Sequence, residues 1–530
     1  MLAKGASDKG SGLTVTGLDV KVERGMLFAA AVHASQQVAA TSARNGKIAV
    51  LADLLTQAET DEVDLLAHFL AGRLRQRRTG IGWRSLTGFQ PAVAPRLTLA
   101  EVDAALDRLS GLSGPGSQLA RKAGLAELMN RATDDEQRFL GGLIVGETRQ
   151  GALEGVLLQA IARAFDVPLA LVRRAAMLSG SVPAAAQAAA AGGAEALVAI
   201  RLQVGRPILP MLAASAPTIA EAFAKLGGDP VAVEAKLDGI RIQAHKQGDR
   251  VGIYSRSLDE ITVRLPEVAT AVAALPCHSC VLDGEALAVD PDGRPRAFQE
   301  TAARSASTAD PRGIVLSSYF FDLLEVNGTE MLDQPGSVRQ ARLAELVPIV
   351  QRVERIVTGD AAAAEQFCRQ VLAQGHEGVV IKHLSLPYEA GRRGAGWIKV
   401  KPVLTLDLVV LAVEHGSGRR KGWLSNLHLG ARDPANGGFV MLGKTFKGMT
   451  DEMLAWQTAR FEELKLDDDG WVVTVRPQQV VEIAFDGVQR SPRYPGGLAL
   501  RFARVVRYRD DKTSAEADTI DTVRSLARWA

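Results

Sequence analysis

A lysine followed by Asp-Gly is the first residue in this chain whose type and setting could do covalent chemistry, in the segment Glu234-Ala235-Lys236-Leu237-Asp238-Gly239-Ile240-Arg241. Alternating apolar residues before Lys236 predict a strand, and Asp-Gly predicts a turn directly after it. A lysine amine is a nucleophile only when it is neutral, so nearby cations or a metal must lower its pKa and neutralise the phosphate that it attacks. Lys-x-Asp-Gly turns also occur on surface hairpins. This segment alone therefore fits either a catalytic lysine or an ordinary surface turn.

Six further segments follow this lysine, and each carries residue types that phosphate or nucleobase chemistry uses. An arginine fork with two hydroxyls suits phosphate or ribose, and two lysines at a spacing of two point to the same face of a strand. Each segment alone is typical of a solvated strand face or a core, whereas all six in this order form a specific pattern. The segments are Ser255-Arg256-Ser257, Asp283-Gly284-Glu285, Phe320-Phe321-Asp322, Glu377 to Lys382, Arg393 with Trp397-Ile398-Lys399-Val400-Lys401, and Arg501 to Lys512.

The order of these motifs resembles that of the covalent nucleotidyltransferase superfamily, and specifically of the ATP-dependent DNA ligases. The resemblance covers nearly the whole chain. Its N-terminal part is similar to the DNA-binding domain of bacterial three-domain ligases, notably at Gly146-Glu147-Thr148-Arg149-Gln150-Gly151. The resemblance implies a ligase that seals nicked duplex DNA through a lysyl-AMP intermediate. AMP would then pass to the 5′-phosphate, and attack by the 3′-hydroxyl would release it.

The resemblance also implies a role for each matching residue. Lys236 would form the phosphoramidate with AMP, Glu234 would contact the adenine amino group, and Phe321 would stack on adenine. ATP would be the adenylate donor, with Mg²⁺ as the metal, which prefers oxygen ligands and retains water. The remaining roles are ribose and phosphate contacts for Arg241, Arg256 and Arg393, α-phosphate contacts for Lys399 and Lys401, ribose and Mg²⁺ contacts for Glu285 and Glu377, orientation of pyrophosphate for Arg507, Asp510 and Lys512, and DNA contacts for Arg149 and Gly151.

Three alternative functions fit the sequence less well. An RNA-capping guanylyltransferase shares the lysine chemistry, but Glu234 and the ligase-like N-terminal part disfavour it. An NAD-dependent ligase is disfavoured because the chain lacks that family's four-cysteine zinc set. A non-catalytic DNA-binding protein on a ligase core is disfavoured because every charged motif residue is present. One departure from the family is Ala503, where these ligases often carry proline, and it bears on backbone rigidity rather than on chemistry.

Composition bounds the protein without identifying its activity. Its 530 residues favour two or three domains, and an apolar fraction of 47% suits a soluble globular protein. Lys plus Arg (62) nearly balances Asp plus Glu (60), so nucleic-acid binding would need local basic clusters. Cys277, Cys280 and Cys368 are too few for a disulfide framework and suit a reducing cytoplasm. The resemblance implies a bacterial protein associated with the nucleoid. The Cys277/Cys280 spacing matches only half a zinc site, which favours ordinary thiols. We also expect the protein to be a monomer with no membrane association.

The hydrophobic patterns divide the chain into regions of different fold class. We expect a flexible tail over residues 1–25 and an all-α domain over 26–203, including a helix capped at Thr133. Residues 204–403 predict an α+β domain with antiparallel sheets. The resemblance implies that the first is a DNA-binding domain and the second a nucleotidyltransferase domain (an ATP-grasp-like adenylation domain). Residues 404–530 carry short strands that predict a small closed β-barrel of the oligonucleotide-binding (OB) fold.

Overall fold

The computed structural model describes residues 21–22, 25–76, 79–148, 154–227, 229–307, 313–389 and 393–527. The predicted tail of residues 1–25 lies almost entirely outside this part of the chain. The described chain forms two compact units, one up to residue 211 and one from residue 212 onward. None of the helices in these described ranges is both long and apolar enough to cross a membrane.

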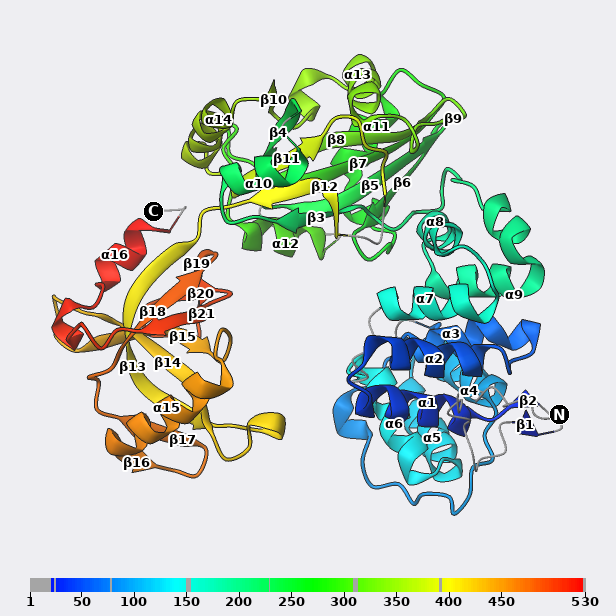
Figure 1. Ribbon diagram of the computed structural model, residues 1–530, viewed down its shortest axis with the longest axis horizontal. Helices are drawn as coiled ribbons and strands as arrows, with labels where there is room; N and C mark the ends of the chain where they lie inside the picture. The colour runs from blue at the N-terminus through cyan, green and yellow to red at the C-terminus, as the bar shows by residue number, and fades with distance from the viewer. Residues whose placement is uncertain are drawn as a thin grey trace, which may run out of the picture. The chain divides into compact units, whose positions relative to one another are not determined.

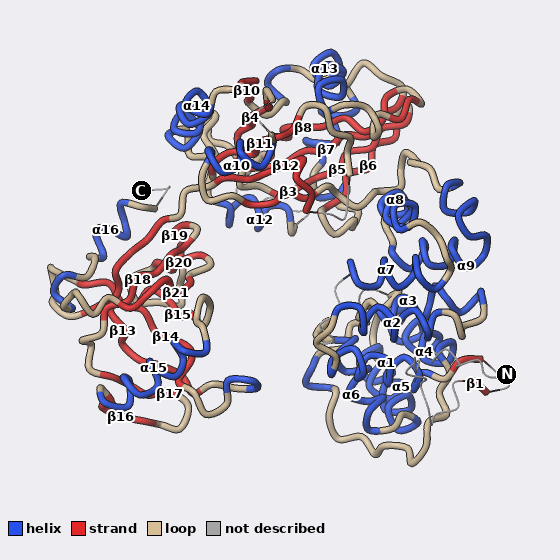
Figure 2. The backbone as a smooth tube through the Cα atoms, in the orientation of Figure 1, coloured by secondary structure: helices blue, strands red, loops and turns tan. Residues whose placement is uncertain are grey.

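The first unit is helical, in agreement with the sequence prediction, and Figures 1 and 2 show its helices stacked around one another. Two short antiparallel strands, β1 (Lys21–Val22) and β2 (Gly25–Met26), precede them. The helices are α1 (Phe28–Ala40), α2 (Arg44–Leu55), α3 (Val63–Leu70), α4 (Leu99–Gly111), α5 (Ser117–Arg131), α6 (Asp134–Val145), α7 (Glu154–Ala164), α8 (Leu169–Ser179) and α9 (Val182–Ala199).

Local sequence signals explain where these helices begin and what they bury. The predicted cap is confirmed at α6, where Thr133 Oγ1 accepts from Glu136 N–H and Glu136 Oε2 accepts from Thr133 N–H at 2.7 Å. The apolar residues of α2 enter one continuous hydrophobic core with those of the other helices. The alanine-rich segment forms α9, which is kinked at Gly193, where φ is +57°. The unit extends to Met211, and within it Leu209 N–H donates to Met177 O.

We call residues 212–400 the central region, and it is an α+β fold with two five-stranded sheets (Figure 1). The first sheet has the order β10-β4-β11-β12-β3, antiparallel except for the β12–β3 pair. Its strands are β3 (Leu212–Ser215), β4 (Val231–Lys236), β10 (Arg355–Thr358), β11 (Gly378–His383) and β12 (Arg393–Val400). The second sheet is antiparallel throughout, and its strands in spatial order are β6 (Arg250–Ser255), β5 (Ile240–Gln247), β7 (Ser279–Ala288), β8 (Leu316–Val326) and β9 (Thr329–Glu330).

Helices cover these sheets and complete two separate cores. On the first sheet pack α10 (Ile219–Leu226) and α14 (Ala361–Ala373), and on the second pack α11 (Pro266–Ala273), α12 (Phe298–Ser305) and α13 (Gly336–Leu346). A buried ion pair ties α13 to β8, with Arg339 Nε donating to Asp322 Oδ1 at 2.7 Å. Because both side chains are almost fully buried, loss of one partner would cost about 3–5 kcal/mol.

We call residues 404–527 the C-terminal region, and it is rich in β-strands, as predicted. Its long strand β13 (Leu404–His415) pairs with β14 on one side and with both β17 and β18 on the other. Within the described ranges, however, the strand ladders do not close into the ring of a barrel. The other elements are β14 (Leu424–Arg432), β15 (Phe439–Thr445), α15 (Asp451–Glu463), β16 (Lys465–Asp468), β17 (Val472–Val475), β18 (Val480–Phe485), β19 (Gly487–Arg490), β20 (Leu498–Arg501), β21 (Arg504–Tyr508) and α16 (Ile520–Ser525).

Candidate functional site

The predicted strand before Lys236 is confirmed, and a short connection with a bend at Gly239 leads from it to β5. Strand β4 ends at this lysine, which lies opposite Gly378 of β11. A Cβ at Gly378 would lie 2.4 Å from Val400 O, and one at Gly239 would lie 2.5 Å from Ala286 O. Only glycine fits at these two close approaches. The packed backbone therefore holds the end of β4 against both sheets of the central region.

Strand register brings residues that are distant in the chain onto one face. Glu234 of β4 lies opposite Val380 of β11, which lies opposite Lys399 of β12. Successive side chains of a strand alternate between faces, so positions two apart share a face. The resulting face carries Glu234, Lys236, Val380, Lys382, Trp397 and Lys399.

A cavity of about 760 Å³ opens on this face and is also lined by the second sheet. This volume lies within the range of small-molecule and cofactor sites. Its wall includes seven of the residues that the resemblance assigned to ATP: Glu234, Lys236, Arg241, Arg256, Glu285, Phe321 and Lys399. The structure therefore brings most of the predicted nucleotide site together in one place.

Lys236 lies beside a buried carboxylate at one side of this cavity. Its Nζ donates to Glu377 Oε2, and Glu377 N–H donates to Lys236 O at 2.9 Å. Lys401 Nζ lies 3.5 Å from the other carboxylate oxygen of Glu377. Burial raises the pKa of the Glu377 carboxyl, but the positive charges of Lys236 and Lys401 outweigh that effect and leave its pKa below the usual value. Glu377 is therefore an ionised partner shared by two lysines.

The second carboxylate, Glu285, faces the cavity from β7, where it lies opposite Arg241 of β5. Burial raises the pKa of Glu285 to about 7, although Lys236 and Arg241 favour its ionised form. Arg241 is held by Asp283, with Nε donating to Oδ1 at 3.0 Å and Nη2 donating to Oδ2 at 2.6 Å. Tyr388 OH donates to the same carboxylate at 2.7 Å. These contacts fix the arginine at the cavity wall.

Four residues that shape this site have no role in the sequence prediction. Tyr388 and Asp283 hold Arg241, and Lys382 and Trp397 line the cavity near Phe321. Lys382 was visible in the motif Glu-Gly-Val-Val-Ile-Lys, but only the register of β4 and β11 reveals its proximity to Glu234. In the sequence, Lys382 follows Val380 by two residues, so their side chains share one face of β11. Val380 lines the cavity, and Lys382 therefore faces the cavity as well.

Several predicted residues lie elsewhere or cannot be placed. Arg393 begins β12, but its side chain is outside the described part of the structure, as are Arg149 and Gly151 altogether. Arg507 pairs with Glu482, at 2.7 Å between Nε and Oε2, on the C-terminal region. A second cavity, of about 430 Å³, lies within that region and is lined in part by Asp510 and Lys512. None of these three C-terminal residues lines the central cavity.

No described group of three or more His, Cys, Asp or Glu side chains is arranged to hold a metal ion. Cys277, Cys280 and Cys368 are free thiols.

Family models of DNA ligases match three segments of this chain. Family models match as ATP dependent DNA ligase domain over residues 210–401, as ATP dependent DNA ligase C terminal region over 420–512, and as DNA ligase N terminus over 84–162. A "Probable DNA ligase" of Nocardioides sp. is 59% identical over 507 residues, covering 94% of this chain and 99% of the relative. Another, of Beutenbergia cavernae, is 60% identical over 512 residues, covering 95% of this chain and 100% of the relative.

A solved structure named "Pmar-Lig_Pre." has a similar fold, with a TM-score of 0.60 at 18% identity over 91% of this chain and 99% of its own. The family models match parts of the helical, central and C-terminal regions, and the relatives align over nearly the full length. From these matches, the chain belongs to the ATP-dependent DNA ligase family.

Proposed function

We propose that this ATP-dependent DNA ligase seals nicks through a covalent AMP adduct on Lys236. The observation that carries the proposal is the position of Lys236 at the end of β4, on the wall of a nucleotide-sized cavity. Two carboxylates, Glu285 and Glu377, and the cations Arg241 and Lys399 lie around it. A lysine among fixed charges of both signs suits phosphoryl transfer, which depends mainly on positioning and electrostatic stabilisation.

The first step forms a phosphorus–nitrogen bond. The neutral amine of Lys236 attacks the α-phosphorus of ATP, and the bond from that phosphorus to the leaving pyrophosphate breaks. Lys399 and Arg241 stabilise negative charge on the phosphate oxygens, while Arg256 offers a further cation at the cavity wall. We also assign Arg393 and Lys401 to phosphate contacts, and Arg507, Asp510 and Lys512 to orientation of the pyrophosphate.

The next two steps transfer AMP and join the strands. An oxygen of the DNA 5′-phosphate attacks the phosphorus bound to Lys236, and the phosphorus–nitrogen bond breaks to return the amine. The 3′-hydroxyl then attacks the activated 5′-phosphate, forming the phosphodiester and releasing AMP. Across the three steps, one ATP is converted to AMP and pyrophosphate for each nick sealed.

Two carboxylates fit Mg²⁺ at this site. Glu285 and Glu377 both reach the surroundings of Lys236, and their oxygens are the ligand type that Mg²⁺ prefers. When bound, Mg²⁺ would supply positive charge to the phosphate oxygens of ATP. The protein's own contribution is to hold the two carboxylates in position by burial and by the pairing of Glu377 with Lys236.

The remaining regions would bind nicked duplex DNA. We assign the helical unit to phosphate contacts, including Arg149 and Gly151, because phosphate contacts dominate affinity for duplexes. We assign the C-terminal region to the OB fold. Its long strand β13 supports this assignment, because it pairs with β14 on one side and with β17 and β18 on the other. The protein would act as a monomer on this substrate.

A single-turnover experiment tests the proposal. The full chain is incubated with ATP labelled at the α-phosphate and Mg²⁺, separated from free nucleotide, and then given nicked duplex DNA. We expect the label to leave the protein as AMP, with about one nick sealed for each labelled molecule. Pyrophosphate added in place of DNA should return the label to ATP. Label that stays on the protein in both additions would contradict a lysyl-AMP intermediate.

A further inference from the structure

One oxygen of the buried Glu234 carboxylate has no partner in the described structure. Glu234 is 3% exposed, and its Oε2 lies 2.6 Å from Lys382 Nζ. Its Oε1 is buried and accepts no hydrogen bond from any described residue. A buried carboxylate oxygen without a donor is costly, so the site is built to receive one. Because Glu234 lines the central cavity, that donor would come from a bound molecule.

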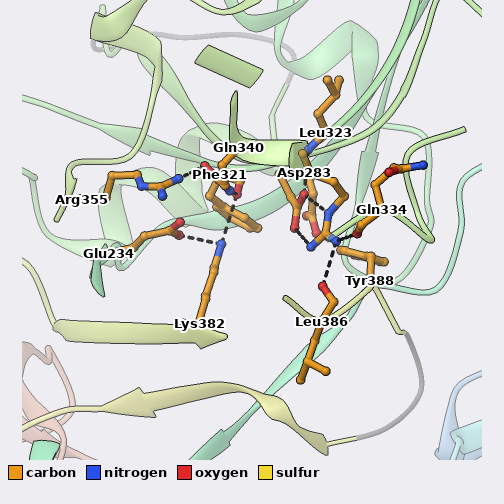
Figure 3. A network of polar contacts seen from close by, with 12 residues as sticks. Glu234, Asp283, Phe321, Leu323, Gln334, Gln340, Arg355, Lys382, Leu386 and Tyr388 are labelled. Carbon is orange, nitrogen blue, oxygen red and sulfur yellow. Dashed lines mark hydrogen bonds and ion pairs between the residues drawn. The ribbon is translucent and has the colours of Figure 1, made fainter. Parts of the chain in front are cut away.

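Lys382 is also buried, and it offers a donor next to this acceptor (Figure 3). Its Nζ donates to Phe321 O at 3.1 Å and pairs with Glu234 Oε2, which together use two of the three ammonium protons. Among the described residues no acceptor is found for the third. Lys382 Nζ also lies 4.5 Å from the ring centroid of Phe321 and 4.2 Å from that of Trp397, both of which line the cavity. The cavity thus presents an acceptor and a donor side by side.

A polar network holds this pair in place. Gln340 Nε2 donates to Phe321 O, the carbonyl that also accepts from Lys382. Gln340 Oε1 in turn accepts from Arg355, as Figure 3 shows. A buried Lys–Glu pair adds little to stability, because desolvation offsets its attraction. The cost of burying Lys382 is better explained by recognition than by folding.

Resting on the proposed function, we infer that Lys382 is a specificity-determining residue that donates a hydrogen bond to N1 of adenine while Glu234 Oε1 accepts one from the adenine amino group. Adenine carries a donor, its amino group, beside an acceptor, N1, and these match the acceptor and donor of the cavity. Guanine carries the opposite pair, O6 and N1–H. It would place an oxygen against the carboxylate and an N–H against the ammonium. ATP is therefore selected at two atoms rather than one.

Nucleotide analogues test this inference in the unaltered protein. In 1-deaza-ATP a C–H replaces N1, and purine riboside triphosphate lacks the amino group. The measurement is the second-order rate constant of protein adenylylation at low nucleotide concentration. We expect 1-deaza-ATP to react about 10- to 100-fold more slowly than ATP, since a hydrogen bond to a charged group is lost. GTP should react at least about 100-fold more slowly than ATP, because both atoms are mismatched.

Variants then assign the effect to Lys382. In Lys382→Met the ratio between ATP and 1-deaza-ATP should fall to near one. The double variant Glu234→Gln/Lys382→Met removes both buried charges and replaces the single variant if that does not fold. In the double variant, too, the ratio between ATP and 1-deaza-ATP should fall to near one. In Glu234→Gln the preference for ATP over 1-deaza-ATP should persist, which makes it the matched control.

Two results would overturn the inference. One is equal reaction of ATP and 1-deaza-ATP with the unaltered protein. The other is discrimination between them that survives replacement of Lys382 by methionine. Both differ from failure of the proposed function, in which the unaltered protein would form no adduct even with ATP.

Discussion

Lys236→Ala should reduce formation of the protein–AMP adduct by about 10⁴-fold or more, because removal of a covalent nucleophile leaves no group to accept AMP. The same variant should still seal a nick whose 5′-phosphate carries AMP in advance, since the last step does not use this amine. The measurement is gel detection of labelled protein and of sealed DNA in parallel reactions. Loss of the first activity with retention of the second would place Lys236 in adenylation specifically.

Lys225→Ala is the matched control for this substitution. Lys225 lies near the end of α10 in the same central region, is exposed, and does not line the central cavity. Its replacement should leave both activities unchanged. A labelled adduct that persists in Lys236→Ala would show that another residue is the nucleophile.

A fragment starting at residue 204 should separate adenylation from DNA binding. It retains the central and C-terminal regions, whose hydrophobic cores are distinct from that of the helical unit. We expect it to adenylate Lys236 at a rate close to that of the whole chain. At about 0.15 M salt it should seal nicks at least about 100-fold more slowly, because the phosphate contacts of the helical unit are missing.

A salt series distinguishes the causes of this loss. Each phosphate contact releases counterions, so a fragment with fewer contacts should show a shallower fall of sealing with salt. Addition of the separate helical unit in trans should not restore the rate at low protein concentration. Equal sealing by fragment and whole chain at every salt would contradict a DNA-binding role for that unit. A folded fragment that fails to adenylate would contradict the independence of the central and C-terminal regions from the helical unit.

Features set by local sequence were predicted most successfully. The cap at Thr133 depends on two side chains three residues apart, and β4 ends at Lys236, just before the Asp-Gly pair that marks a break in the strand pattern. The motif order also indicated the residues that gather at the cavity. That success came from the family resemblance, because no local pattern places Lys236 beside Glu377, a residue far away in the chain.

Features set by strand register could not be predicted from the sequence. The pairing of Glu234 with Lys382 follows from the antiparallel alignment of β4 with β11, and a shift of one residue would move Lys382 to the other face. Closure of the C-terminal strands depends on pairing between distant strands, and the described ladders do not show the predicted ring. Asp510 and Lys512 form part of a cavity of their own rather than of the central one. Their proposed role with pyrophosphate rests on the resemblance alone.

The most direct test of the covalent mechanism is to locate the nucleotide on the protein. The full chain is incubated separately with α-labelled ATP, GTP and NAD⁺ in the presence of Mg²⁺, and the labelled peptide is identified by mass spectrometry. The proposed mechanism predicts strong labelling from ATP alone, with one AMP bonded to Nζ of Lys236. Labelling from ATP on a different residue, or equal labelling from GTP or NAD⁺, would contradict it.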